Sequence, residues 1–467
     1  MSLIEKLDKK KILILGFGRE GQSTYRFLRK LFPNKKLGIA DKKSSKELDA
    51  KALKIISTDR NIDKFLGDDY FKSLDLYEIV IKSPGISNKF DEIRKAKDKG
   101  VTFTSQTKIF FELCKGKIIG VTGTKGKSTT TSLIYHILKT AKIPSVLLGN
   151  IGKPPLDYLE EDNEKTFFVF EMSSHQLTDI EKSPDIAVFL NVFPEHLDYY
   201  LNYEEYIKAK GNITRFQESS DILIYNADFP EIAEIANQSK ARKYKFSAQT
   251  KPEDGCFVAD GKIVFVDKKI EKFRLDVNRI PLLGKHNLYN VMAAIIASKV
   301  AGVDFDSINR AVRNFRPLEG RLETVGIYKT VLFVNDTLAT IPEATIAAVD
   351  AFGDKKLTLI LGGFDRKISF DNLGKDLAKR KNVSGVILIG QTGRRIKKSL
   401  EKFRYMGKIY DKGKTNMSEI IKYASKIAVP GGVVLLSPAS TSFDMFKDYK
   451  DRGNQFKNAV KLLGLRS

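Results

Sequence analysis

Short runs of consecutive apolar residues recur along the chain, and stretches with the apolar spacing of amphipathic helices follow most of them. A continuous apolar run bounded by turn residues is typical of a strand buried on both faces, and alternation of such strands with helices predicts parallel sheets. The runs are KILIL, KLGIAD and EIVIKS near the start, then SVLLGN, TFFVFE and IAVFLNV, and finally VLFVND, LTLILGG, GVILIG and VVLLS. The chain is therefore predicted to be an α/β protein of consecutive open sheets.

The order of these elements divides the chain into three predicted domains. A length of 467 residues agrees with this number, because domains usually hold about 100–200 residues each. We predict a Rossmann-like N-terminal domain over residues 1–108, a P-loop ATPase-like central domain over 109–317 and a Rossmann-like C-terminal domain over 318–467. Within the central domain, the stretch CFVADGKIVFVDKK predicts a β-hairpin.

The stretch KIIGVTGTKGKSTTT, residues 117–131, predicts a phosphate-binding loop. Glycines let backbone N–H groups converge on phosphate oxygens, the following helix N-terminus favours negative charge, and a lysine and a hydroxyl serve the phosphates and Mg²⁺. Val121 stands where the strict pattern has glycine, so an ordinary Gly/Thr-rich turn is the alternative. The predicted triphosphate ligands are Gly123, Thr124, Gly126, Lys127, Ser128 and Thr129.

A second glycine pattern, GFGREG at residues 16–21, follows the first strand. This GxGxxG, with Asp41 at the end of the next strand about 20 residues later, is the fingerprint of dinucleotide-binding units. The same backbone geometry binds the diphosphate of NAD or of a nucleotide-sugar, but an NAD dehydrogenase would leave the phosphate loop without a role. The strand EIVIKS runs into Ser83, Pro84 and Gly85, at the edge where open α/β sheets bind ligands.

Polar residues also follow two strands beyond the phosphate loop. TFFVFEMSSHQL delivers Glu171 and Ser173, and IAVFLNVFPEHLD delivers His196 with acidic neighbours. An acid and a histidine at neighbouring strand ends suit a Mg²⁺-nucleotide site, although either residue alone would be an ordinary polar strand end. The next helix carries Lys208 and Lys210, and such lysines usually form a solvated face.

Two further sets of polar residues lie later in the chain. Asn287 and Asn290 share one face of the helix that GKHNLYN opens, where they either cap and pack the helix or hydrogen-bond a base. In the predicted third domain, Asp336, residues 365–367 and Ser437 follow strands. A single triphosphate site between two other α/β domains indicates a protein that closes around several substrates.

The net charge of +23 raises the question of a nucleic-acid partner. The lysines are scattered among acids without a long basic tail, so a solvated lysine-rich surface is the better interpretation and no nucleic acid is expected. Cys114 and Cys256 lack a metal-like spacing, and no apolar run approaches the ~20 residues that cross a bilayer. With no signal-peptide pattern at the start, these features predict a cytoplasmic protein without a membrane partner.

Beyond these patterns, the chain resembles the ATP-dependent Mur ligase family of peptidoglycan synthesis through all three predicted domains. The shared motifs occur in family order: GxGxxG, SPGI, TGTKGKST, GNIG, FEMSSHQL, NVFPEHLD, GKHNLYN, GRLE, NDTLAT, LGGFDRK and LLSPASTSFDMFKDYKDRGNQF. The last motif together with TGTKGKST is far more specific than either alone. Glycines at 120, 123 and 126 are the spacing of this ligase type, so the resemblance removes the objection from Val121.

The resemblance implies an ATP-dependent carboxylate–amine ligase that acts in peptidoglycan precursor synthesis, and so in cell wall biogenesis, cell shape and cell division. It is strongest to the branch that adds glutamate, with D-glutamate expected, to UDP-N-acetylmuramoyl-L-alanine through an acyl phosphate. ATP and two Mg²⁺ ions are the implied cofactors, both substrates are small molecules, and a monomer is expected. The alternatives are the same reaction with L-glutamate, or another Mur-type or folylpolyglutamate-type ligase.

The resemblance also implies roles for individual residues. The catalytic set would be Lys127, Glu171, His196 and a carbamylated Lys210, with Lys208 as the alternative lysine. The metal ligands would be Ser128, Glu171, His196 and Lys210. The ATP site would be completed by Asn287, Asn290, Arg321 and Asp336. The UDP substrate would contact Gly16, Gly18, Asp41, Ser83, Gly85, Asn150 and Ser173. Glutamate would contact Thr340, Arg366, Lys367, Ser442 and Tyr449.

Two positions depart from the family pattern. Leu338 stands where the family commonly has lysine, which removes a cation near the glutamate or phosphate site. Lys367 or Arg366 compensates within a subgroup of unchanged chemistry, or the change marks a different amino acid such as L-glutamate. Tyr449 stands where the family often has phenylalanine.

Two rivals come from other functional classes. A binding or regulatory protein that kept the fold without the chemistry would have lost Lys127, Glu171, His196 or the candidate lysine, and all are present. A nucleic-acid-stimulated P-loop ATPase is suggested by the charge alone.

Overall fold

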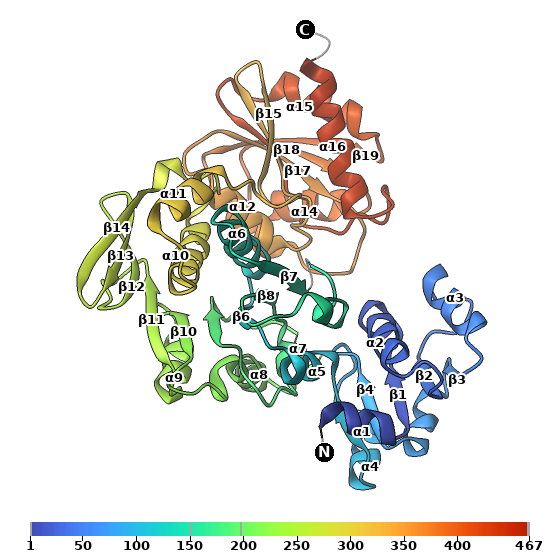
Figure 1. Cartoon of the computed structure of the whole chain (residues 1–467). Helices are drawn as coiled ribbons and strands as arrows, with labels where there is room; N and C mark the ends of the chain where they lie inside the picture. Colours follow the sequence, from blue (N-terminus) through green and yellow to red (C-terminus); the bar gives the residue numbers. More distant parts are fainter. Residues whose placement is uncertain (1, 150–151, 197–198, 465–467) are drawn as a thin grey trace. The chain divides into compact units, whose positions relative to one another are not determined.

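The computed structural model describes residues 2–149, 152–196 and 199–464, which form three β-sheets flanked by helices (Figure 1). This confirms the predicted α/β class with three open sheets. The chain divides into two compact units, Met1–Val277 with Tyr289–Val312, and Asn278–Leu288 with Arg313–Ser467. The first unit holds two of the sheets and the second unit holds the third. The three domain boundaries stay a prediction.

The first sheet is parallel, in the order β3-β2-β1-β4-β5. Its strands are β1 (Ile12–Leu15), β2 (Leu37–Asp41), β3 (Ile62–Leu66), β4 (Ile79–Lys82) and β5 (Thr102–Thr104). Every residue of β1 and β4 is buried, as expected of central strands in a parallel sheet. The edge strands β3 and β5 are mostly half-buried and mix polar with apolar residues, so they lack the continuous apolar run that predicted the others. The helices are α1 (Leu3–Lys9), α2 (Arg19–Leu31), α3 (Ala50–Thr58), η1 (Tyr70–Leu76), α4 (Asp91–Asp98) and α5 (Gln106–Leu113).

The second sheet has the order β14-β13-β12-β11-β10-β9-β6-β8-β7. Its strands are β6 (Lys117–Thr122), β7 (Ser145–Gly149), β8 (Phe167–Glu171), β9 (Ile186–Phe189), β10 (Ile222–Asn226), β11 (Arg242–Ser247), β12 (Gly255–Ala259), β13 (Lys262–Asp267) and β14 (Ile270–Asp276). β12 and β13 pair antiparallel, which confirms the predicted hairpin. The helices are α6 (Lys127–Thr140), η2 (Pro155–Glu161), α7 (Ser174–Leu177), α8 (Tyr203–Arg215), α9 (Pro230–Gln238), η3 (Val277–Arg279), α10 (Lys285–Val300) and α11 (Phe305–Asn314).

The third sheet has the order β15-β16-β20-β17-β18-β19, in which only β15 runs antiparallel to its neighbour. Its strands are β15 (Glu323–Tyr328), β16 (Val331–Asn335), β17 (Leu357–Gly362), β18 (Val383–Ile389), β19 (Lys408–Gly413) and β20 (Val433–Leu436). The helices are α12 (Pro342–Asp350), α13 (Asp371–Ala378), α14 (Gly393–Lys402), α15 (Met417–Ile427) and α16 (Tyr449–Gly464). The loops after β16, β17 and β20 therefore emerge at one edge of this sheet.

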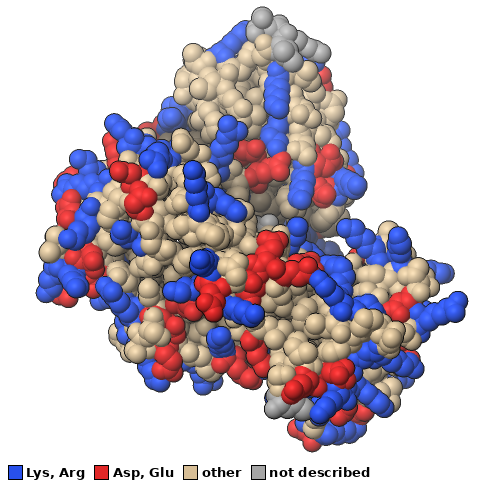
Figure 2. Space-filling view, viewed as in Figure 1, with Lys and Arg blue, Asp and Glu red and all other residues tan. Residues whose placement is uncertain are grey.

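Basic and acidic side chains are interspersed over the face of the molecule seen in Figure 2. This pattern agrees with a lysine-rich solvated surface. Among the described residues, none of the helices has the length and apolar character that crossing a membrane would require.

Candidate functional site

The predicted phosphate loop connects strand β6 to helix α6 in the first compact unit. Gly126 caps the helix with a left-handed φ of 85°, and a Cβ added there would lie 2.3 Å from the Oδ1 atom of Asn290. Only glycine fits this position, because both the backbone conformation and the contact exclude a side chain. Thr130 Oγ1 donates to the same Asn290 oxygen at 3.2 Å, so α10 packs directly behind the loop.

Lys127 and Ser128 begin helix α6, and their side chains contact different parts of the site. Lys127 Nζ donates to the carbonyl oxygens of Gly123 at 2.9 Å and Thr124 at 3.0 Å, so the lysine spans its own loop. Ser128 Oγ donates to Glu171 Oε1 at 3.0 Å. Glu171 ends β8, which pairs with β6 and so brings this carboxylate to the loop.

The other oxygen of Glu171, Oε2, is buried without a hydrogen-bond partner among the described residues. A buried carboxylate oxygen with no donor is costly, and hard carboxylate and hydroxyl oxygens are the protein ligands that Mg²⁺ prefers. The Glu171–Ser128 pair therefore fits a cation. Within the described residues, no group of three or more His, Cys, Asp and Glu side chains converges on one point.

Lys210 lies under the phosphate loop, whereas Lys208 is exposed on the same helix. The Lys210 side chain is 1% exposed, and its Nζ donates to Gly123 O at 2.9 Å. Burial, with the charge of Lys127 nearby, lowers the pKa of Lys210 well below its usual range. This lowering favours the uncharged, nucleophilic form of the Lys210 amine relative to that of an exposed lysine.

His196 belongs to an aromatic and acidic cluster beside the loop. Its Nε2 lies 3.9 Å from Glu195 Oε2, and the other oxygen of Glu195 accepts from Lys125 Nζ at 2.6 Å. The His196 ring is 5.0 Å from that of His175 and 6.3 Å from that of Tyr206. The predicted catalytic residues and phosphate ligands thus gather around one loop.

Two residues that shape this loop were not predicted. Asn191 accepts from the backbone N–H of Lys125 at 2.8 Å and donates to the carbonyl of Lys125 at 3.0 Å. The hydroxyl of Tyr206 lies 2.9 Å from Thr124 Oγ1. Asn191 directly follows the run IAVFL, so its place after a strand was a usable signal, whereas the packing of Tyr206 was not visible in the sequence.

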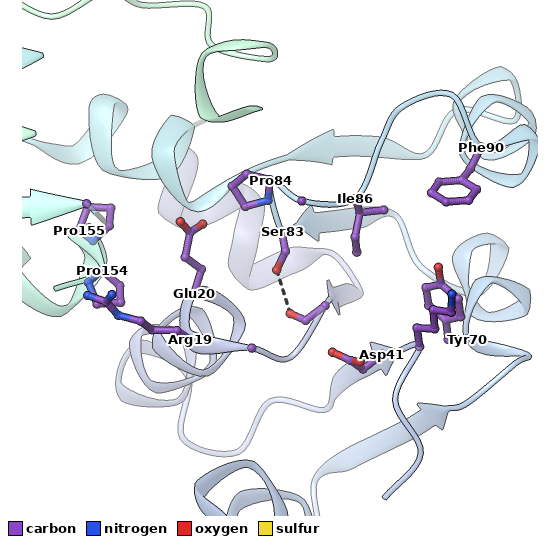
Figure 3. Close-up of a pocket in the computed structure, with 15 residues that line it drawn as sticks. Arg19, Glu20, Asp41, Tyr70, Ser83, Pro84, Ile86, Phe90, Pro154 and Pro155 are labelled. Atoms are coloured by element: carbon purple, nitrogen blue, oxygen red, sulfur yellow. Dashed lines mark hydrogen bonds between the residues drawn. The ribbon is translucent and has the colours of Figure 1, made fainter. Parts of the chain in front are cut away.

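The first sheet carries a cavity of about 510 Å³ at the carboxyl ends of its strands (Figure 3). Five of the residues predicted for the UDP substrate line it: Gly16, Gly18, Asp41, Ser83 and Gly85. Ser83 Oγ donates to Gly16 O at 3.0 Å, and Asp41 Oδ2 accepts from the backbone N–H of Phe17 at 2.5 Å. The glycine turn, the aspartate and the loop after β4 therefore form one continuous wall.

Several other side chains that line the cavity were not predicted from the sequence, and most of them are polar. They include Arg19, Glu20, Lys42 and Tyr70, with Phe90 as an aromatic wall. Arg19 and Glu20 are two of the three variable positions of the GxGxxG pattern, which is why the motif did not single them out.

Two further residues were predicted for the UDP substrate, and of these Ser173 does not line the cavity. Ser173 caps α7, where its Oγ accepts from Gln176 N at 3.2 Å. Gln176 Nε2 in turn donates to Glu20 Oε1 at 3.0 Å, so Ser173 supports the wall indirectly. Asn150 lies outside the described residues.

The ATP residues predicted outside the phosphate loop divide between the two compact units. Asn290 lies in the first unit, whereas Asn287, Arg321 and Asp336 lie in the second. Asn287 Nδ2 donates to Leu283 O at 2.6 Å, and Arg321 is exposed. Burial raises the pKa of Asp336 to about 7, although the Ser437 hydroxyl donates to its carboxylate at 2.9 Å.

The residues predicted for glutamate lie on loops at the carboxyl edge of the third sheet. Phe364 N donates to Thr441 O at 2.8 Å, which joins the loop carrying the exposed Arg366 and Lys367 to the loop carrying Ser442. Ser442 is buried, Thr340 and Leu338 are half-buried, and Tyr449, the first residue of α16, is 40% exposed. No hydrogen bond between the predicted glutamate ligands joins them within the described residues.

A buried arginine that was not predicted holds these loops together. Arg452 in α16 is 0% exposed, and its guanidinium donates to Thr337 Oγ1 at 2.9 Å, Thr337 O at 2.8 Å and Ser440 O at 3.1 Å. Burial lowers the pKa of Arg452 to about 10. In the sequence this arginine appears only within the motif KDRG, which does not indicate whether its side chain is buried or exposed.

Comparisons with protein families and their members extend over almost the whole chain. Residues 121–298 match the family model described as Mur ligase middle domain, and residues 320–440 match the model described as Mur ligase, glutamate ligase domain. The chain is 38% identical over 460 residues to UDP-N-acetylmuramoylalanine–D-glutamate ligase of Acetivibrio thermocellus, covering 98% of this chain and 97% of that protein. It is 34% identical over 462 residues to the protein of the same name from Clostridium tetani, covering 97% of each chain.

Solved structures of similar fold are more distant in sequence. UDP-N-acetylmuramate-alanine ligase from Thermotoga maritima superimposes with a TM-score of 0.58 at 18% identity, covering 97% of this chain and 99% of that one. The MurF ligase from the same organism, solved in complex with ADP, has a TM-score of 0.57 at 17% identity, covering 99% and 97%. At these identities, the similarity to both structures shows a shared fold and nothing further.

Proposed function

Because the chain belongs to the Mur ligase family, we propose that it joins D-glutamate to UDP-N-acetylmuramoyl-L-alanine and uses ATP to activate the carboxylate of that precursor. The observation that carries the proposal is the 38% identity, over 98% of the chain, to a ligase named for this reaction. The phosphate loop with Lys127, Glu171 and Lys210 around it supports the ATP-dependent step.

Amide formation from a free carboxylate needs a better leaving group than oxide. The γ-phosphoryl group of ATP is transferred to the alanyl carboxylate, which releases ADP and gives an acyl phosphate. The amine of glutamate then attacks the carbonyl carbon, loses a proton, and phosphate leaves. The reactants are anionic, so the loop N–H groups and Lys127 act by offsetting their repulsion, and closure against water protects the acyl phosphate.

Mg²⁺ would be held by Glu171 and Ser128, with His196 and a carbamylated Lys210 at a second position. When bound, it supplies charge neutralisation for the phosphates. The partnerless Glu171 oxygen supports the first position. Removal of divalent cations with EDTA is expected to stop phosphate release, and added Mg²⁺ is expected to restore it.

Lys210 is proposed as the carbamylated residue in preference to Lys208. A buried, uncharged amine reacts with CO₂ to give an anionic oxygen ligand, whereas an exposed and charged one does not. The burial of Lys210 and its contact with the phosphate loop support this choice.

We place the UDP end of the precursor in the cavity of the first sheet, against Gly16, Asp41 and Ser83. Glutamate would bind the loops of the third sheet through Ser442 with Lys367 or Arg366, because its carboxylates need charged donors. In this proposal the molecule is a cytoplasmic monomer of three domains.

Phosphate release with UDP-N-acetylmuramoyl-L-alanine, ATP and either D- or L-glutamate tests the proposal. Turnover that requires all three substrates and prefers D-glutamate is expected. Preference for L-glutamate would overturn the assignment of D-glutamate as the substrate. Leu338, which stands where the family commonly has lysine, is the specific reason to compare the two enantiomers. Stimulation of ATP hydrolysis by DNA or RNA without any response to the precursor would overturn the ligase itself.

A further inference from the structure

The loop between β4 and α4, residues 83–88, forms one side of the cavity in the first sheet. Ser83, Pro84, Gly85 and Ile86 all line the cavity (Figure 3). The start of this loop is anchored to its own sheet, where Ser83 N donates to Leu15 O at 2.8 Å. The remainder of the loop is held by Lys82 of β4 and by two contacts from outside that sheet.

One of the outside contacts is the hydroxyl of Tyr199. It donates to the carbonyl oxygen of Pro84 at 3.1 Å and lies 3.4 Å from that of Ile86. The Tyr199 ring packs edge-on against His175 with 4.1 Å between centroids, and burial raises its pKa. The hydroxyl thus stays protonated and remains a donor at neutral pH.

A second contact is the carboxylate of Asp179. Asn88 Nδ2 donates to Asp179 Oδ1 at 2.8 Å, and Lys82 Nζ lies 3.5 Å from Asp179 Oδ2. Lys82 is a cation with only 3% of its side chain exposed, and its Nζ also donates to Ile86 O at 2.7 Å. A buried cation needs such compensation, so Lys82 and Asp179 together hold the loop at Ile86 and Asn88.

Tyr199 and Asp179 belong to the segments that carry the proposed catalytic residues. Asp179 lies two residues after the short helix α7, which begins after the Glu171 strand, and Tyr199 lies three residues after His196. The loop that lines the precursor cavity is therefore attached, through side chains, to the two segments at the phosphate loop.

We propose that Tyr199 and Asp179 are positioning residues that hold the 83–88 loop, so that a precursor bound by its UDP end in the cavity presents its carboxylate to the phosphate loop. This inference rests on the proposed function for the identity of the ligand. Neither side chain lines the cavity, so each acts through the backbone or side chains of the loop.

Tyr199→Phe tests the proposal, because it removes the hydroxyl and keeps the ring against His175. We expect KM for UDP-N-acetylmuramoyl-L-alanine to rise about fivefold, the effect of one hydrogen bond, with kcat and the KM for ATP and glutamate within about twofold of wild type. Hydrogen–deuterium exchange of the peptide covering residues 83–88 is expected to become faster in the free protein. A purely structural role would instead lower Tm and kcat without selecting one substrate.

Tyr405→Phe is the matched control. Tyr405 is buried in the second compact unit and also donates its hydroxyl to a backbone carbonyl, Val383 O, at 2.9 Å. The control is expected to leave the precursor KM and the exchange of the 83–88 peptide unchanged.

Asn88→Ala, alone and combined with Tyr199→Phe, examines the other tether. Because both side chains hold one loop, their effects on the precursor KM are expected to be non-additive.

The exchange measurement separates this inference from the proposed function. Failure of the wild type to turn over the precursor would reject the ligase, while faster loop exchange in Tyr199→Phe would still support the tether. Normal turnover by wild type, with Tyr199→Phe unchanged in both precursor KM and loop exchange, would overturn the tether. A fall in kcat at constant KM would also overturn it.

Discussion

Two glycine-rich turns in the first compact unit look alike in sequence and in backbone, but their surroundings differ. Each connects a buried central strand to a helix, and each contains a glycine with a left-handed φ, 91° at Gly16 and 85° at Gly126. At the first turn, the N–H of Phe17 is already bonded to Asp41, and the cavity has aromatic walls.

At the second turn, Lys125 belongs to the loop and Lys127 begins the helix that follows it. Lys210, Glu171 and Glu195 add one further lysine and two acids from neighbouring elements. The glycines therefore predict that an anion binds, whereas the surrounding side chains determine whether the bound anion is only held or also reacts. In the proposed function, the first turn holds the diphosphate of the precursor, and the second takes part in transfer of the phosphoryl group.

The largest expected effect separates the two turns directly. Lys127→Ala should lower the rate of phosphate release at least about a thousandfold, because the charge that offsets phosphate repulsion is lost. Calorimetric binding of the UDP precursor should be unchanged. Lys139→Ala, an exposed lysine at the other end of α6, is the control and should retain full activity. A normally active Lys127→Ala enzyme would contradict the proposed difference between the two turns.

The next effect concerns the lysine beneath the second turn. Lys210→Ala should reduce kcat about a hundredfold, since an anionic metal ligand would be missing. Added acetate or formate is expected to restore part of the rate, because a small carboxylate can occupy the space. Lys208→Ala should behave as wild type. An unimpaired Lys210→Ala, or loss in Lys208→Ala instead, would contradict the assignment.

A smaller change is expected at the first turn. Asp41→Asn weakens the acceptor that holds Phe17 N–H and should raise KM for the UDP precursor about tenfold, with KM for ATP unchanged. Asp63→Asn, on an edge strand of the same sheet and away from the cavity, is the control. An equal rise in KM for ATP would show that the two turns are not independent.

The smallest effect tests the glycines themselves. Gly18 has an ordinary φ of −74° and open space where a Cβ would lie, so Gly18→Ala should leave Tm unchanged. It should raise the precursor KM by a factor of about three or less, through crowding of the diphosphate. Gly126→Ala should unfold at a lower temperature, because of its φ and its contact with Asn290. Thermal melts and precursor titrations check both variants.

The sequence predicted the parts of this molecule in which one local pattern suffices. Buried central strands such as β1 and β4 are continuous apolar runs, and the glycine turns that follow strands carry their own signature. The edge strands β3 and β5 were not predicted, because they are short, mostly half-buried and mix polar with apolar residues. Their strand form comes from pairing with a neighbour, which a single run does not encode.

The same limit applies to the site. Lys127 was predicted from its place after Gly126, whereas the roles of Arg452 and Asn191 depend on partners supplied by tertiary folding. The choice between Lys208 and Lys210 rested on resemblance, since both lie on one helix. Burial of only one of them is a property of packing against the phosphate loop.

The buried guanidinium of Arg452 has a consequence for how this protein can diverge. Its hydrogen bonds fix the backbone of two loops from behind, at Thr337 and Ser440, so the loop shape does not depend on the neighbouring side chain at Leu338. We therefore expect substitutions at position 338 to leave the loop shape unchanged, so that their effect on the choice between D- and L-glutamate can be measured apart from the fold. Substitution of Arg452 would remove this support, so the shape of the loops and the amino-acid selectivity would then change together.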